Sequence, residues 1–324
     1  MARGGFPRVV IIAVYFGRLP AYFQLWLDSC RRNHAFDWLV VTDAETAAYD
    51  WPANVRARPM TLMQFRARMS ATLGLEIHLR SPYKACDFRP IFWTLLEGEE
   101  RACDFWGHCD LDVIFGNLAR YVTIEMLARY DRIFTLGHLT LYRNADFSNR
   151  MGLRPHRALD WREILSDPEH RGFDEHIGVG LIWRDHRARM FKDESIVADI
   201  DPAIARFERV APYRNDREQL FFHDRGRVLR VFWRNGRRDE EEFAYIHFQK
   251  RRSMTALPPP GTESYVIAPG GFFACDASDL SPDLARRLNP WRPDLRDSFH
   301  RWRSAFRSFR RRKGFVRDLR RAAP

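Results

Sequence analysis

Two aspartates stand one residue apart inside an apolar segment of this chain. The segment reads DFWGHCDLDVIFG from residue 104 to 116, and the carboxylates belong to Asp110 and Asp112. A strand that ends there directs Leu111 into the core and both carboxylates to the opposite face. Two like charges about 4 Å apart repel by roughly 4 kcal/mol at an effective dielectric constant of about 20, so the pair needs a proton, a basic partner or a cation. Carboxylate oxygens suit Mg²⁺ and Mn²⁺, which predicts a metal site; the alternative is that one Asp caps a turn and the other is solvated.

The elements that would position this pair begin as a parallel α/β sheet. Residues 8–16, RVVIIAVYF, are typical of a strand buried on both faces, and residues 21–32 place apolar side chains at helical spacing. Residues 36–43, FDWLVVTD, predict a second strand that ends on Asp43. A strand, a helix and a strand form a βαβ unit, which brings ligand-binding groups to the carboxyl ends of the strands.

The rest of the chain predicts a mixture of helices and strands. We expect strands near 55–58 and over 264–273, a flexible loop over 172–180, and a hairpin over 230–251 whose second strand carries His247 to an edge. Residues 131–144 predict a strand, a glycine turn, and then either a strand or a helix. Helices are expected over 61–73, 81–96, 123–130, 158–165 and 217–223. We predict one domain over residues 1–281 and a basic aromatic helical tail over 282–324.

The positive charge of the chain lies mainly in that tail. The 324 residues carry a formal net charge of +11, and residues 297–324 account for +8 of it. Phe299, Trp302, Phe306 and Phe309 recur there at helical spacing among arginines. Such a helix could bind an anionic membrane surface, or dock its aromatic face on its own domain. Nucleic-acid binding ranks well behind both.

Composition favours a cytoplasmic globular protein. The membrane-binding alternative for the tail would place it peripherally on the inner face of the cell membrane. The apolar run over 9–16 is too short to cross a bilayer, and no small-residue cleavage site follows it. The five cysteines are odd in number and lack CxxC spacing, so we expect buried packing rather than disulfides or zinc ligation.

Six segments, in this order, resemble a bacterial group of glycosyltransferase-like proteins of the GT-A fold. The segments are VVIIAVYFG, VVTD, SPYKACDFRP, DFWGHCDLDVIFGNL, DRIFTLGHLTLYRN and YIHFQKR, and the resemblance spans about residues 8–252. It implies a Rossmann-type α/β fold with a mixed, mainly parallel sheet flanked by helices. It also implies metal-dependent transfer of a sugar from a nucleotide-diphosphate donor to a glycan or lipid-linked acceptor, in bacterial surface polysaccharide synthesis.

The resemblance implies roles around the metal. Asp112 would be a direct ligand of Mn²⁺ or Mg²⁺, and Asp110 would be shared between the metal and the donor ribose. His247 would be a further ligand, and Lys250 would contact the diphosphate. The segment HFQKR lacks the glycine of the His-x-x-Gly-x-x-Lys pattern and has altered spacing, so His247 could instead be a strand histidine hydrogen-bonded to a backbone carbonyl.

The donor side offers five further candidates. Tyr15 and Phe16 end the first strand, and the resemblance implies that the base binds there, so an aromatic face could stack on it; both could instead be core residues. Asp43 suits a hydrogen bond to the base or ribose, or a helix cap. Lys84 and Asp87 lie one helical turn apart, where the Asp could hold the ribose or the two could form an intrahelical ion pair.

The acceptor side needs a group that can accept a proton from a hydroxyl. Asp174 and Glu175, in GFDEHIGVG, resemble the acidic pair of an acceptor-facing loop, and either could be a base or a helix cap. His138, with Arg143 nearby, is a second candidate.

Two other functions remain compatible with the residues. A metal-dependent phosphohydrolase or nuclease also uses clustered carboxylates, but usually more Asp and His than one DxD pair supplies. The second alternative is a non-catalytic protein that binds polyanions or membrane surfaces through its tail.

Overall fold

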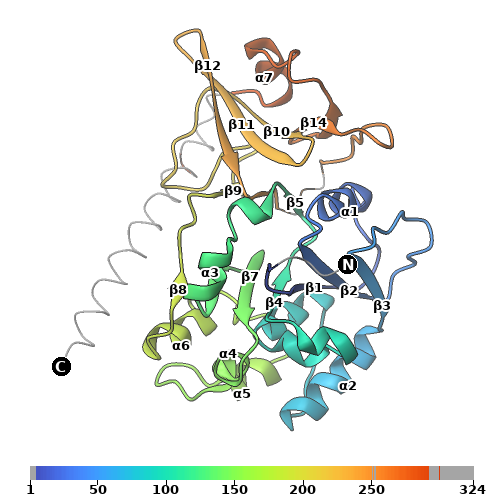
Figure 1. Ribbon diagram of the computed structural model, residues 1–324, viewed down its shortest axis with the longest axis vertical. Coiled ribbons are helices and arrows are strands. Elements are labelled where there is room, and N and C mark those ends of the chain that lie inside the picture. The colour runs from blue at the N-terminus through green and yellow to red at the C-terminus, as the bar shows by residue number, and fades with distance from the viewer. Residues whose placement is uncertain (1–4, 250, 252, 292–298, 300–324) are drawn as a thin grey trace, which may run out of the picture. The chain divides into compact units, whose positions relative to one another are not determined.

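The computed structural model describes residues 5–249, 251, 253–291 and 299. They form two compact units (Figure 1). Unit 1 comprises the described residues within 1–111 and 118–194, and unit 2 those within 112–117 and 195–324. Among the described residues, no helix is both long enough and apolar enough to cross a membrane. The predicted tail lies outside the described residues, except for residues 282–291, which include a short helix, and Phe299.

Unit 1 is built on a seven-stranded sheet with the strand order β3-β2-β1-β4-β7-β6-β8. Strands β3, β2, β1 and β4 are parallel neighbours, β7 runs antiparallel to β4 and β6, and β8 is parallel to β6. Its strands are β1 (Val9–Tyr15), β2 (Phe36–Thr42), β3 (Val55–Pro59), β4 (Phe105–Cys109), β6 (Arg132–Leu136), β7 (Leu139–Arg143) and β8 (Met190–Phe191).

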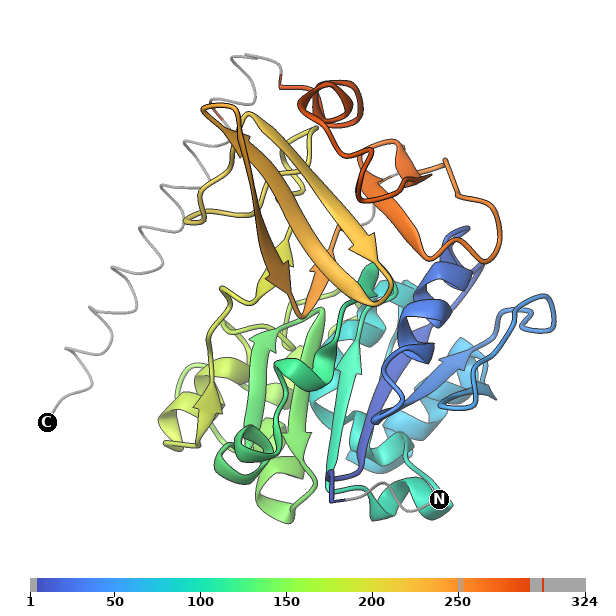
Figure 2. The ribbon, with the colours of Figure 1, turned by 45° about the horizontal axis from the view of Figure 1, so that its top comes forward.

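Helices flank this sheet. Figure 2 shows α1 in front of the sheet and α2 behind it. The α-helices of unit 1 are α1 (Phe23–Arg31), α2 (Leu62–Leu73), α3 (Ile124–Arg129), α4 (Asp146–Asn149), α5 (Trp161–Ser166) and α6 (Val179–Asp185). The 3₁₀ helices are η1 (Pro82–Leu95), η2 (Gly98–Ala102), η3 (Leu118–Arg120) and η4 (Met151–Leu153).

The core of unit 1 follows from strand alternation. Val10 and Ile12 of β1 pack on the same side as Phe65 of α2 and Phe88 of η1, within one buried cluster. Successive side chains of a strand point to opposite faces, so Ile11 faces the other side, where it is equally buried. Burial on both faces explains why β1 reads as an uninterrupted apolar run.

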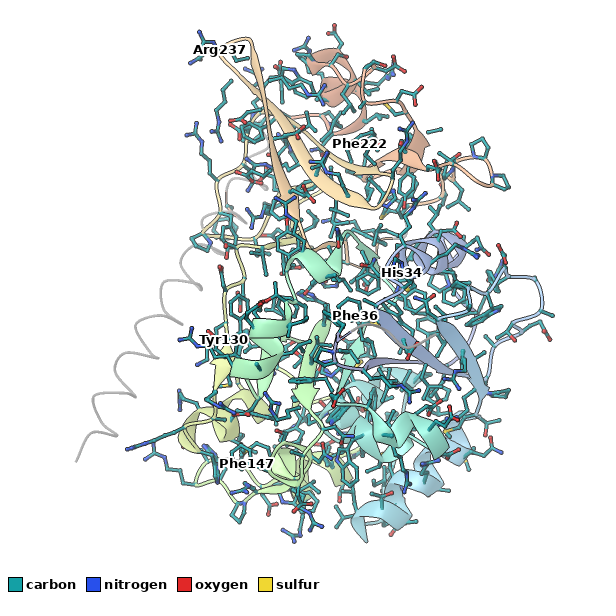
Figure 3. The ribbon with its side chains drawn as sticks, in the orientation of Figure 1. His34, Phe36, Tyr130, Phe147, Phe222 and Arg237 are labelled. Carbon is teal, nitrogen blue, oxygen red and sulfur yellow. The ribbon has the colours of Figure 1, made fainter. Side chains whose placement is uncertain are left out.

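Unit 2 contains two antiparallel or mixed sheets. One has the order β12-β11-β10-β14-β15, with β10 (Glu218–Asp224), β11 (Arg227–Arg234), β12 (Arg237–Phe243), β14 (Ser264–Ala268) and β15 (Gly271–Ala274). The other has the order β5-β13-β9, with β5 (Val113–Phe115), β9 (Val197–Asp199) and β13 (Tyr245–His247). Helix α7 (Pro282–Leu288) contacts β10. In Figure 3, Phe222 lies on β10, and Arg237 lies at the tip of the β11–β12 hairpin.

The structure confirms the predicted α/β class, with a mixed and mainly parallel sheet flanked by helices. Three predictions about local structure were wrong. Most of residues 217–223 belong to strand β10 instead of a helix, because their backbone pairs with two partner strands, β11 and β14, and Phe221 and Phe222 are buried on opposite faces of the sheet. In the segment 81–96, Pro82–Leu95 form a 3₁₀ helix and not an α-helix; Pro90 lies inside it, and a proline ring is disfavoured in an α-helix interior. His247 lies on the central strand of a small sheet, not on an edge.

Candidate functional site

In unit 2, a short sheet brings Asp112 and His247 together. Asp112 immediately precedes β5, and His247 is the register partner of Val113 on the neighbouring strand β13. The His247 Nε2 atom lies 3.5 Å from Asp112 Oδ1. The backbone N–H of Phe248 donates to the Asp112 carbonyl over 3.1 Å, which fixes the register at this point. Asp112 and His247 are both buried.

Asp199 holds the other side of the same imidazole. It is the register partner of His247 on β9, and its Oδ1 lies 2.8 Å from His247 Nδ1. Gln249 also donates to Asp199 Oδ1, over 3.2 Å. A carboxylate that accepts the Nδ1 proton leaves Nε2 as the ring atom directed at Asp112. Metal-binding histidines commonly have this arrangement, because the second-shell carboxylate fixes the tautomer and the ring orientation.

The two carboxylates also control the charge of His247. Burial alone would lower the pKa of the imidazole, but Asp112 and Asp199 outweigh it and raise that pKa to about 10. In the absence of a metal, a proton therefore sits between the carboxylates. A divalent cation is the other species that satisfies them, and carboxylate oxygen with imidazole nitrogen is a ligand set that Mn²⁺ accepts. The residues present therefore fit a metal ion.

In unit 1, Arg89 joins two of the predicted carboxylates. Its guanidinium donates to Asp174 Oδ2 over 2.6 Å and to the Gly137 carbonyl over 2.9 Å, and it also pairs with Asp110. Arg89 and Asp174 are buried, whereas Asp110 is partly exposed. Burial raises the pKa of the Asp174 carboxyl, and Arg89 only partly opposes that rise. Arg89 itself is kept charged, because Asp110 and Asp174 raise its pKa despite its burial.

Lys84 and Asp87 form a fully buried ion pair that fastens the Asp174 loop. Lys84 Nζ lies 2.9 Å from Asp87 Oδ2, and neither side chain is exposed. The Asp87 carboxylate also accepts the backbone N–H groups of Arg171 and Phe173, each over 2.8 Å. Gly172, between them, has φ +68°, a left-handed conformation that glycine adopts without steric cost. We call this arrangement of Lys84, Asp87 and residues 171–173 the loop clamp.

The predicted base-binding residues have partners of their own. The Phe16 ring packs against Phe65, 5.5 Å away, in the buried cluster of unit 1, while Tyr15 is half-buried. Asp43 is exposed, and its Oδ1 accepts the backbone N–H of Gly17 over 2.7 Å, which fixes the loop that follows β1.

Three candidates remain. His138 is buried, and its carbonyl accepts the Asp110 N–H over 3.1 Å, so the β6–β7 turn supports the DxD segment. Glu175 is exposed beside Asp174. Lys250 lies outside the described residues.

The sequence reading missed Asp199 and Arg89 as members of these groups. Asp199 ends a short apolar segment, IVAD, much as Asp43 ends VVTD, so the same pattern of a strand that ends on an aspartate was present. Arg89 lies in SPYKACDFRP, two residues after Asp87, and its charge among apolar neighbours was the available signal.

Comparisons with known proteins add a family and several solved structures. No curated protein matches the chain in sequence. An active-site variant of LgtC is 12% identical, with a TM-score of 0.42, over 76% of this chain and 91% of that one. The galactosyltransferase LgtC with donor and acceptor sugar analogues is 12% identical, with a TM-score of 0.36, over 60% of this chain and 76% of that one. Mouse xyloside xylosyltransferase 1 is 10% identical, with a TM-score of 0.38, over 60% of this chain and 88% of that one.

One family model covers most of the chain. It matches residues 11–276, which include all the residues of both charged groups described above. The chain therefore belongs to the family described as a family of unknown function (DUF6625).

Proposed function

We propose that this protein is a metal-dependent glycosyltransferase of the GT-A type, which uses a nucleotide-diphosphate sugar as its donor. The observation that carries the proposal is the Asp112–His247–Asp199 arrangement of unit 2, in which a buried imidazole is oriented by one carboxylate toward another. The resemblance implies Asp112 and His247 as metal ligands, and their close approach supports that part of the proposal.

In this proposal, Asp112 and His247 bind the Mn²⁺ or Mg²⁺ ion, and Asp199 orients His247 from behind. Asp110 is the second carboxylate of the pair, and chain connectivity keeps its Cα within about 7 Å of that of Asp112. A bound cation would offset the negative charge that develops on the departing nucleoside diphosphate.

The acceptor side is assigned to the Asp174 loop. The carboxyl of Asp174 is buried, and that burial raises its pKa, which makes it a stronger base than an ordinary aspartate. The exposed Glu175 and the buried His138 are the alternative bases. Lys84 and Asp87 are assigned a positioning role, because the Asp87 carboxylate already binds Lys84 and two backbone N–H groups of the loop.

The donor side is assigned to the residues that follow β1 and β2. Tyr15 and Asp43 are the proposed contacts to base and ribose, with Phe16 supporting them from the core, and Lys250 is the proposed diphosphate contact. A glycan or lipid-linked acceptor in surface polysaccharide synthesis is the proposed substrate class, and the basic tail is the proposed membrane contact.

A thermal-shift experiment tests the proposal. The full chain is heated with UDP-, GDP- and CMP-sugars, each with and without Mn²⁺. A ligand at 100 times its Kd adds about 2.7 kcal/mol of stability, which shifts the Tm by several degrees. We expect a shift with one nucleotide that requires Mn²⁺, its loss in Asp112→Asn, and its retention in Asp239→Asn, an exposed carboxylate on β12 of the same unit.

Three results would contradict the proposal. An unchanged response in Asp112→Asn would remove the metal assignment. A response to heparin or nucleic acid alone would favour a polyanion-binding protein. Metal-dependent cleavage of a phosphodiester without sugar transfer would favour a phosphohydrolase.

A further inference from the structure

An exposed aromatic ring lies beside the charged cluster of unit 1. Tyr83, on η1, leaves 53% of its surface exposed, although most residues of η1 are buried. Its ring lies 4.5 Å from the imidazole of His170, with an angle of 50° between the two planes. His170 belongs to the loop that carries Asp174. The two rings therefore bring η1 and the Asp174 loop together at the surface.

This ring pair adjoins the carboxylates. His170 Nε2 lies 3.6 Å from Asp87 Oδ1 and 4.0 Å from Asp174 Oδ1. Asp174 in turn pairs with Arg89, which also binds Asp110. Partial burial raises the pKa of Tyr83 to about 12, and Asp110 and Asp174 add to that rise while Arg89 opposes it. The Tyr83 hydroxyl thus lies within electrostatic range of these three groups.

We propose that Tyr83 and His170 form the subsite for a sugar ring of the acceptor, an unphosphorylated glycan whose apolar face stacks on Tyr83. The inference rests on the proposed function, since it names the chemical class of the acceptor. A pyranose presents C–H groups on one face and hydroxyl groups at its rim. An exposed aromatic ring packs against the C–H face, while carboxylates and a guanidinium bind the hydroxyls.

The charges favour a sugar over a nucleotide at this position. Single exposed aromatic side chains are common, so exposure alone carries no weight. Lys84 and Asp87 neutralise each other in the interior, and Arg89 is shared between the carboxylates of Asp110 and Asp174. That group therefore has one carboxylate more than its guanidinium can neutralise, which disfavours a phosphate and suits a neutral polyol. Asp110 is the carboxylate of this group that is partly exposed, so it is the one placed to accept a hydrogen bond from a sugar hydroxyl, while the buried Arg89 holds it from behind.

Saturation-transfer NMR tests this subsite without metal or nucleotide. The probes are the methyl glycosides of glucose, galactose and N-acetylglucosamine, with uridine and guanosine as nucleoside probes. The full chain is compared with Tyr83→Ala, Tyr83→Phe and Phe147→Ala. Phe147 is the matched control, a partly exposed aromatic residue of the same unit on α4 (Figure 3), which packs on Trp183 and Arg154.

We expect saturation transfer to the ring C–H protons of at least one glycoside. Its affinity should fall about fivefold to tenfold in Tyr83→Ala and change less than about twofold in Tyr83→Phe and Phe147→Ala. Three results would overturn the inference: unchanged glycoside affinity in Tyr83→Ala, no saturation transfer to any of the three glycosides, or displacement of the bound glycoside by a nucleoside. A missing Mn²⁺-dependent nucleotide shift with intact glycoside binding would instead count against the proposed function alone.

Discussion

The loop clamp can be tested by breaking its buried ion pair one partner at a time. Lys84 and Asp87 are both fully buried, so removing either one leaves an uncompensated charge in the protein interior. Such a change typically costs about 3–5 kcal/mol. In Lys84→Met, the carboxylate keeps the N–H donors of Arg171 and Phe173, which places the cost near the lower limit. In Asp87→Asn, Lys84 loses its counter-charge, and the amide NH₂ faces a backbone N–H of the loop whichever way it is turned, which places the cost near the upper limit.

The double variant Lys84→Met/Asp87→Asn leaves no buried charge at this position. Its cost should therefore be smaller than the sum of the two single costs by about 2 kcal/mol or more. Urea unfolding followed by tryptophan fluorescence suits the measurement, because seven of the ten tryptophans belong to unit 1. Glu169→Gln is the control: its partner Arg80 is well exposed, so its cost should stay below about 1 kcal/mol.

Hydrogen exchange adds a local readout of the same clamp. The amides of Arg171 and Phe173 donate to the Asp87 carboxylate, so both should exchange faster in Asp87→Asn. A coupling energy below about 0.5 kcal/mol between the two substitutions, or unchanged exchange of both amides, would refute the clamp.

Three further predictions concern other parts of the chain. Asp199→Asn should weaken Mn²⁺ binding about 10-fold to 100-fold, measured by calorimetric titration, and an unchanged affinity would contradict its orienting role. Burial would raise the pKa of the Asp216 carboxyl, but Arg234 and Arg230 outweigh it and hold that pKa below its ordinary value. The stabilising effect of the carboxylate is therefore present above about pH 4 and is lost as the pH falls through the lowered pKa. Asp216→Asn should make the free energy of unfolding depend less on pH at acid pH, and an unchanged pH dependence would contradict this. Deleting residues 297–324 should reduce binding to anionic vesicles, at about 1 kcal/mol for each basic residue near the surface, more than it reduces donor hydrolysis; equal partition of both forms would refute the membrane role.

The elements that the sequence predicts best are those with a local cause. The run VVIIAVY is apolar at every position because β1 is covered on both faces, and the helical spacing within 21–32 marks the buried face of α1. The Thr61 hydroxyl accepts the backbone N–H of Gln64 at the start of α2, and Gly74 ends the helix in a left-handed conformation. Local residues therefore determine both ends of that helix.

Long-range pairing explains what the sequence does not predict. Asp199 lies on a three-residue strand, too short for a periodic signal, and it meets His247 across 48 residues of chain. The ion pair of Lys84 and Asp87 is one of the alternatives that their spacing allows. The loop clamp also needs the N–H groups of Arg171 and Phe173, which lie 84 and 86 residues after Asp87. The sequence around Asp87 does not indicate these distant partners.

The central claim is that Asp112 and His247 bind a divalent cation. Titration of the metal-free full chain with Mn²⁺ without added nucleotide, monitored by electron paramagnetic resonance, measures that binding directly. We predict one bound Mn²⁺ per chain, lost in Asp112→Asn and in His247→Gln and retained in Asp239→Asn. Equal Mn²⁺ binding by all four proteins would contradict the claim.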